Sequence, residues 1–272
     1  MPELGEILPS SLRPHARWER LGASRVPALL VHPAWSDSAE APPPLVLWFH
    51  GRTVNKELDP GRYLRWMRAG IAACAIDLPG HGERFEQRLQ GPETAWEVIH
   101  QMVEEFDEVV DALRKFDAFD LSRLGIGGMS LGGMVALARL TRDHPCCCAG
   151  VEATTGMWAD DSTRAQFEHR VPATIRQLEP IRNLDRWREI PLQAIHARGD
   201  EWVKYERQAA FLDVLRARYR NPGLIETIIY EHTGAPYEHI GFGRKAADAK
   251  QKQTAFFAQW LGVTEKSTDG HG

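Results

Sequence analysis

The sequence alternates short apolar runs, bounded by Pro, Gly and Asp, with longer amphipathic stretches. This alternation is typical of βαβ units and predicts a mostly parallel sheet. Most of the apolar runs are continuous, as expected for strands that are covered on both faces. The chain is therefore predicted to have an α/β fold, with a doubly wound sheet and helices on both of its faces. Strands are predicted at 28–32, 45–49, 71–76, 123–127, 147–153, 192–196 and 224–230.

The amphipathic stretches between these runs are predicted to be helices. In the longest of them, apolar residues from Val98 through Phe106 to Leu113 fall close to a stripe with a period of 3.6 residues. The chain has 272 residues, 43% of them hydrophobic, which is enough for one substantial core, and we expect a single domain over 1–272. The predicted helices are 61–69, 94–116, 131–141, 205–218 and 244–261.

One segment interrupts the alternation. Residues 156–189 are polar, rich in Arg, Asp and Trp, and contain Pro172 and Pro180. We expect short helices here, inserted between two strands. They form either a surface excursion or a small cap over the strand ends, and the residues favour neither alternative.

The charge balance and the N-terminal residues exclude several classes of partner. The chain has 33 Lys and Arg against 37 Asp and Glu, a net charge of −4, with no long run of one sign, so nucleic acid is not an expected partner. Residues 1–6 do not resemble a signal peptide, and no apolar run reaches membrane-spanning length. We therefore expect a cytoplasmic protein that does not enter a membrane. The sequence indicates no oligomeric state.

Three of the four cysteines are consecutive, at Cys146, Cys147 and Cys148. This spacing suits neither a disulfide framework nor the paired ligands of a zinc site. The three residues are interpreted as small buried hydrophobic residues of one strand in a reducing compartment. No metal site is predicted.

The segment Gly128-Met129-Ser130-Leu131-Gly132 has the Gly-x-Ser-x-Gly pattern of a nucleophile elbow and lies between a predicted strand and a predicted helix. A sharp turn from strand to helix crowds the backbone around the serine, which explains glycine at both flanking positions. Ser130 would then project at a helix N-terminus, where amide N–H groups and the helix dipole favour developing negative charge. The motif predicts nucleophilic catalysis by Ser130.

Two further segments follow predicted strands. The segment 50–53, His-Gly-Arg-Thr, follows the strand at 45–49, and the segment 77–84, Asp-Leu-Pro-Gly-His-Gly-Glu-Arg, follows the strand at 71–76. Gly80 and Gly82 are interpreted as turn-forming residues, and His81 as a residue of loop packing or of the pocket wall.

With the elbow, these segments resemble a small bacterial α/β-hydrolase esterase, related to the dienelactone-hydrolase and prolyl-oligopeptidase-like families, over about residues 45–261. Dienelactone hydrolases proper have a cysteine nucleophile, so Ser130 does not imply their substrate. The resemblance implies an oxyanion hole that is formed by backbone N–H groups. The expected donors are Leu131 and Arg52, with Thr53 as the alternative to Arg52.

The resemblance also implies a catalytic acid after a later strand. The loop 197–203 resembles the Gly/Asp/Val loop that holds the acid in this family, and Asp200 is the expected residue. An isolated Asp near a helix start is otherwise a helix cap or a solvated loop charge. Asp200 lies between Ser130 and His239 in the chain, which is the order nucleophile, acid, base expected of the fold. Glu152 is the competing carboxylate.

The base is expected after the last strand, where both His232 and His239 lie. His232 follows the strand by two residues, which leaves little chain to return its ring to Ser130. His239 follows the turn-forming stretch 234–236 and precedes the closing helix. The spacing therefore favours His239.

The implied activity is that of a serine hydrolase that cleaves a small-molecule carboxylic ester through an acyl-enzyme, without a metal or an organic cofactor. Met129, Met157, Trp158 and Trp202 lie beside predicted strand ends and are candidate pocket walls. Because the insertion is short, we expect a compact pocket that favours short acyl groups. A thioesterase, an acyl-peptide hydrolase or a lactonase would use the same machinery, and a non-catalytic small-molecule-binding protein would share the fold.

Overall fold

The computed structural model describes residues 8–35, 41–158 and 173–263. The strands in these ranges form one sheet in the order β1-β2-β4-β3-β5-β6-β7-β8. β2 is antiparallel to both of its neighbours, β1 and β4, and all other neighbours are parallel. The predicted mostly parallel sheet is confirmed. The strands are β1 (Ala16–Leu21), β2 (Val26–Val31), β3 (Pro44–Phe49), β4 (Ala72–Ile76), β5 (Asp120–Met129), β6 (Cys148–Glu152), β7 (Leu192–Ala197) and β8 (Ile225–Tyr230).

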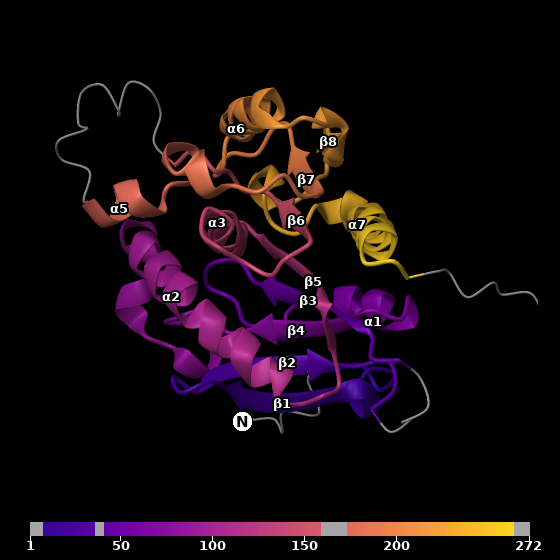
Figure 1. Cartoon of the computed structure of the whole chain (residues 1–272). Coiled ribbons are helices and arrows are strands. Elements are labelled where there is room, and N and C mark those ends of the chain that lie inside the picture. The colour runs from indigo at the N-terminus through magenta and orange to yellow at the C-terminus, as the bar shows by residue number, and fades with distance from the viewer. Residues whose placement is uncertain (1–7, 36–40, 159–172, 264–272) are drawn as a thin grey trace, which may run out of the picture.

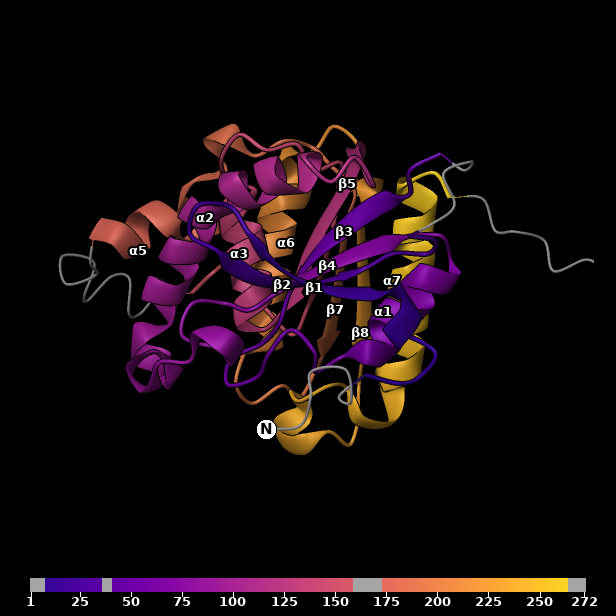
Figure 2. The ribbon, with the colours of Figure 1, turned by 90° about the horizontal axis from the view of Figure 1, so that it is seen from below.

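Helices cover both faces of the sheet, as predicted. Figure 1 shows the sheet running through the molecule, and Figure 2 shows α1 and α7 on one side of it, with α2, α3 and α6 on the other. Each long helix lies within two residues of its predicted bounds. The helices are α1 (Pro60–Arg68), α2 (Ala95–Arg114), α3 (Leu131–Arg139), α5 (Ala173–Leu178), α6 (Tyr205–Arg218) and α7 (Ala246–Trp260).

The core has two main layers, one on each face of the sheet, and the central strand β3 contributes side chains to both. All six of its residues are buried. Leu47 and Phe49 belong to the cluster that includes residues of α2 and α3, whereas Val46 and Trp48 belong to the cluster that includes residues of α1 and α7. Side chains alternate between the two faces of a strand, and because both faces are covered here, the run is continuously apolar.

The strand β1 was not predicted. It pairs with β2 as a hairpin, with Ala16 opposite Val31 and Leu21 opposite Val26. As an edge strand β1 is half-buried, and only Leu21 is fully inside. Charged residues are common on such edges because they discourage pairing with other chains. They also remove the apolar pattern by which a strand is predicted.

The prediction for the cysteines was partly wrong. Only Cys148 lies in β6, and Cys146 and Cys147 precede it. Cys146 and Cys148 are buried, but Cys147 is only half-buried. All four cysteines are free thiols.

The described part of the insertion consists of α5 and two short 3-10 turns, Pro180–Arg182 and Leu184–Arg186. α5 lies against α2, at the side of the molecule (Figure 1). Residues 159–172 of the insertion, including Pro172, lie outside the described residues. Within the three described ranges, no helix is both long enough and apolar enough to cross a membrane.

Candidate active site

Ser130 lies in the sharp turn between β5 and α3. Its backbone has φ 52° and ψ −117°, a conformation that a residue with a side chain rarely adopts. The flanking glycines have a steric cause. A Cβ on Gly128 would lie 2.4 Å from the carbonyl carbon of Gly132, and one on Gly132 would lie 2.2 Å from the carbonyl oxygen of Phe49. The turn therefore packs backbone against backbone on both sides of Ser130.

Hydrogen bonds to the end of β6, to the loop after it and to α3 hold this turn. The N–H of Ser130 donates to the carbonyl of Glu152 at 2.8 Å. The carbonyl of Ser130 accepts the hydroxyl of Thr154 at 2.8 Å and the N–H of Met134 at 3.0 Å. These bonds stabilise a backbone conformation that is otherwise unfavourable, and so fix the position of Ser130 Oγ.

His239 joins Ser130 to Asp200. Its Nε2 lies 2.9 Å from Ser130 Oγ, and its Nδ1 lies 2.8 Å from Asp200 Oδ2. Asp200 follows β7 and His239 follows β8, so all three side chains come from the carboxyl ends of parallel strands. The structure thus brings together the three residues that were expected to form a triad.

The carboxyl of Asp200 is buried and fully hydrogen-bonded. Oδ1 accepts the N–H groups of Trp202 at 2.9 Å and Val203 at 2.8 Å. Burial alone would raise the pKa of Asp200, but hydrogen bonds from His196 and His239 lower it to about 2. Asp200 is therefore a carboxylate at neutral pH and accepts a hydrogen bond from the Nδ1–H of His239.

The competing residues lie elsewhere. The side chain of His232 is 87% exposed and lies 3.6 Å from Glu238. Glu152 is buried in a bidentate pair with Arg62, at 2.9 and 2.8 Å. Neither is in hydrogen-bonding contact with Ser130 Oγ or His239 in the described part of the chain.

A loop carboxylate that was not predicted holds the turn before His239. The carboxylate of Glu238 accepts hydrogen bonds from the N–H of Thr233 at 2.7 Å, from the hydroxyl of Thr233 at 2.6 Å and from the N–H of Gly234 at 3.0 Å. These bonds lower the pKa of Glu238 to about 2. Tyr237 and Glu238 both have positive φ, a conformation that no sequence motif indicated.

A cavity of about 1000 Å³ opens at Ser130 and His239. Of the four predicted wall residues, Met129, Trp158 and Trp202 line it. Met157 is not among the lining residues, and it packs against the main core. The other apolar and aromatic wall residues are Trp48, Val54, Leu58, Tyr63, Pro92, Ala95, Trp96, Ile99, Leu131, Met134, Ile175, Val203 and Ile240.

The expected oxyanion donors lie at the same cavity. Leu131 and Arg52 both line it. Thr53 is exposed, has φ 64°, and donates its hydroxyl to the carbonyl of Arg52. Gly51 lies against the elbow, since a Cβ there would be 3.7 Å from Ser130 Cβ. Because Arg52 lines the cavity and Thr53 is not among the lining residues, the geometry favours Arg52 over Thr53 as the second donor.

Charged residues form one part of the cavity wall, which the sequence did not indicate. Asp59 pairs with Lys250 Nζ at 2.7 Å and with Arg62 Nε at 3.0 Å. Burial opposes ionisation of Asp59, but the two cations lower its pKa. Within the described ranges, no group of three or more His, Cys, Asp or Glu side chains is arranged to hold a metal ion.

The chain matches a family model and is similar to proteins of known sequence or structure. The model of the prolyl oligopeptidase family matches residues 62–264. The esterase YjfP of Escherichia coli is 26% identical over 163 residues, which cover 58% of this chain and 63% of that protein. The putative esterase YitV of Bacillus subtilis is 26% identical over 196 residues, which cover 65% of this chain and 76% of that protein. The crystal structure of TT1662 from Thermus thermophilus superposes with a TM-score of 0.67 at 23% identity, covering 92% of this chain and 99% of that one.

Proposed function

Because this chain belongs to the prolyl oligopeptidase family of α/β-hydrolases, we propose that it is a serine esterase with Ser130 as nucleophile, His239 as base and Asp200 as acid. Family membership makes the chain a hydrolase. We propose, beyond this, which bond it cleaves and which roles these residues have.

One observation carries the proposal. The two ring nitrogens of His239 are bonded at the same time to Asp200, at 2.8 Å, and to Ser130 Oγ, at 2.9 Å. A carboxylate accepts a hydrogen bond from Nδ1–H and so keeps the proton on that nitrogen, which leaves Nε2 free to accept the proton of the serine hydroxyl. The imidazole is thus held in the tautomer and at the distance that a general base needs.

The proposed reaction has two halves. Ser130 Oγ attacks the ester carbonyl carbon as His239 takes its proton, and the N–H groups of Leu131 and Arg52 stabilise the charge on the carbonyl oxygen. Protonated His239 then donates its proton to the leaving alcohol, which leaves the acyl group on Ser130. Water, activated by His239 in the same way, releases the acid.

The cavity argues for a larger acyl group than the short insertion suggested. Sites for small molecules typically measure about 300–1,000 Å³, and the volume of about 1000 Å³ here is at the top of that range. Five aromatic side chains line it: Trp48, Tyr63, Trp96, Trp158 and Trp202. We therefore propose apolar esters that include bulky or aromatic acyl groups, rather than short chains alone.

Cleavage of an aminoacyl or peptide amide is a second candidate, favoured by the family match. The same nucleophile and base would serve both reactions. The paired charges of Asp59 and Lys250 at the wall offer a polar contact that a simple ester does not need. A thioester or a lactone would also use this machinery.

Ser130→Ala tests the proposal. The variant should keep the fold and lose at least about a thousandfold in ester hydrolysis, the scale of removing a triad member. Wild-type protein should be labelled by a fluorophosphonate, and the variant should not. Ser122→Ala is the matched control, since Ser122 is an exposed serine on β5, the strand that precedes the turn with Ser130.

Retention of activity within tenfold in Ser130→Ala contradicts the nucleophile. If wild-type protein resists the probe and hydrolyses no ester, the binding-protein alternative replaces the enzyme. A panel of p-nitrophenyl esters of graded acyl length, with benzoyl esters, thioesters and aminoacyl amides, identifies the preferred bond. Each methylene buried in the cavity should contribute up to about 0.8 kcal/mol, until the cavity is full.

A further inference from the structure

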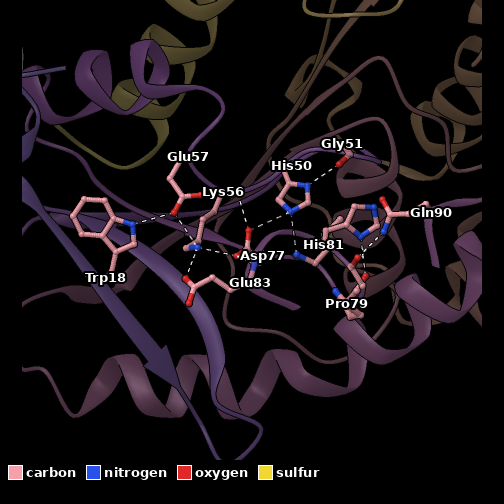
Figure 3. A network of polar contacts seen from close by, with 12 residues as sticks. Trp18, His50, Gly51, Lys56, Glu57, Asp77, Pro79, His81, Glu83 and Gln90 are labelled. Carbon is pink, nitrogen blue, oxygen red and sulfur yellow. Dashed lines mark hydrogen bonds and ion pairs between the residues drawn. The ribbon is translucent and has the colours of Figure 1, made fainter. Parts of the chain in front are cut away.

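A buried polar cluster lies beside the cavity, where β3 and β4 end. His50 follows β3 directly, and Asp77 follows β4 directly. Figure 3 shows these two residues and Lys56 between the loops that follow the strands, with a continuous set of polar contacts around them. None of the three has been assigned a part in the reaction above.

The hydrogen bonds of His50 determine which ring nitrogen carries the proton. A backbone N–H can only donate, and that of Leu78 lies 3.1 Å from His50 Nε2, so Nε2 is the acceptor. A carbonyl oxygen can only accept, and that of Gly51 lies 2.6 Å from His50 Nδ1, so Nδ1 carries the proton. Burial lowers the pKa of His50 to about 4, so the ring is neutral at physiological pH.

The bond to Gly51 orients the peptide group that joins Gly51 to Arg52. The described residues contain no cis peptide bond. In a planar trans peptide, the N–H points away from the C=O. With the Gly51 carbonyl turned inward to His50, the N–H of Arg52 faces the opposite way. Among the described residues, none accepts a hydrogen bond from this N–H. Arg52 also lines the cavity at Ser130.

The second loop holds the His50 ring from its other side. Asp77 accepts the backbone N–H of Lys56 at 2.9 Å, its ammonium at 2.8 Å and the N–H of Glu83 at 3.0 Å. A Cβ on Gly82 would lie 2.1 Å from this carboxylate, which explains the glycine. Asp77 therefore fixes the loop that presents the Leu78 N–H to His50.

The same ammonium ties the cluster to β1. Lys56 Nζ also lies 2.9 Å from Glu57 and 2.7 Å from Glu83, and Glu57 accepts the indole N–H of Trp18 at 3.0 Å. The cluster thus links both loops to the edge of the sheet, as Figure 3 shows.

We propose that His50 is a positioning residue for the oxyanion hole: its Nδ1–H holds the Gly51 carbonyl inward and thereby aims the Arg52 N–H at the carbonyl oxygen of the substrate. This role rests on the proposed esterase function. His50 acts through Arg52 and stabilises the transition state, in which the oxyanion has formed, more than the bound substrate.

Variants at His50 test the donor itself. His50→Leu removes the N–H and should lower kcat for an ester by about a hundredfold, the scale of losing one oxyanion donor, with KM within about threefold. Inhibition by phenylboronic acid, which forms a tetrahedral adduct on the serine, should weaken by the same factor. His50→Asn places an amide donor near the position of Nδ1 and should restore kcat to within about tenfold of wild type.

His81→Leu is the matched control. His81 is as deeply buried as His50 and donates from Nδ1 to a carbonyl, that of Pro79, at 2.8 Å, but this carbonyl is not in the oxyanion loop. His81→Leu should lower the melting temperature about as much as His50→Leu and leave kcat within about threefold. Equal losses of kcat in the two leucine variants would overturn the proposal, and so would a His50→Asn variant as slow as His50→Leu.

The tautomer is measured on the wild-type protein, which needs no variant to be active. In ¹⁵N-histidine-labelled protein, two-bond ¹H–¹⁵N correlations should show one ring with Nδ1 protonated and Nε2 unprotonated from about pH 5 to 8. Its signals should be missing from His50→Asn. A proton on Nε2 overturns the inference. Failure of the esterase proposal is recognised separately, by wild-type protein that resists the fluorophosphonate.

Discussion

The indole of Trp202 lies over the imidazole of His239, with ring centroids 4.9 Å apart and an angle of 40° between the planes. The same indole stacks on Tyr237, at 5.0 Å and 28°. The side chain of Trp202 is 51% exposed, although the backbone N–H of this residue donates to Asp200 Oδ1. Trp202 therefore contacts His239, follows Asp200 by two residues in the chain and lines the cavity.

We expect Trp202→Ala to lower kcat/KM for esters by about three- to tenfold, because an aromatic contact contributes about 0.5–1.5 kcal/mol and its loss frees the imidazole. Steady-state kinetics measure this effect. Tyr237→Ala is the control, since Tyr237 contacts Trp202 and is about equally exposed. A loss in Tyr237→Ala as large as in Trp202→Ala would show that the contact with His239 is not the cause.

The assignment of the base predicts a contrast between two histidines of one loop. His239→Ala should lose at least about a thousandfold in kcat, as when a triad member is removed. His232→Ala should keep most of the activity, because its side chain is 87% exposed and contacts only Glu238 among the described residues. The reverse pattern in the two variants would transfer the role of base to His232.

Stability should fall with pH below about 6.5. Burial lowers the pKa of His50 and of His144 to about 4, from 6.5. The unfolded chain therefore binds more protons than the folded one between about pH 4 and 6.5, so the free energy of unfolding decreases as the pH falls through this window. Each histidine contributes up to about 1.4 kcal/mol per pH unit there.

Urea midpoints at pH 4.5, 5.5, 6.5 and 7.5 measure this slope. His144→Asn removes one of the titrating groups and should reduce the slope. An unchanged slope in that variant would contradict the assignment of His144.

The buried pair of Arg62 and Glu152 predicts a large stability effect. Arg62 is 3% exposed, pairs with Glu152 and lies over the ring of Trp48 at 4.1 Å. Arg62→Met should cost about 3–5 kcal/mol, because it leaves a buried carboxylate without its partner. The double variant Arg62→Met/Glu152→Gln should recover part of this loss. Chemical denaturation measures both, and a double variant less stable than Arg62→Met contradicts the explanation.

The parts of the fold that repeat a simple pattern were predictable. Continuous apolar runs such as Leu45 to Phe49 identify buried parallel strands, because both faces of the sheet are covered. The glycines beside Ser130 identify the elbow, because backbone packs on backbone there. The charged edge strand β1 escaped prediction because its pairing depends on β2 rather than on its own apolar residues.

The residues of the candidate site were predictable where their order along the chain identifies them. They were not predictable where their role depends on the conformation of a loop. Asp200 and His239 follow the last two strands and meet Ser130 in the structure. Glu238 escaped notice because its role depends on a turn with two residues at positive φ. The inward turn of the Gly51 carbonyl depends on His50 and Leu78, which come from different loops. Such contacts between loops leave no periodic signal in a sequence.

The order of the strands also bears on when the molecule becomes active during its synthesis. From the middle of the sheet to one edge, the strands lie in chain order: β5, β6, β7 and β8. Ser130 and His239 are 109 residues apart in the sequence. Under the proposed mechanism, a nascent chain that has formed only the elbow has Ser130 without its base and should not yet hydrolyse esters. Because domains form from the N-terminal side during translation, the proposed triad is complete only after β8 has joined the sheet and His239 has reached Ser130. In refolding, recovered activity then reports that final step and lags behind the far-ultraviolet signal of the helices.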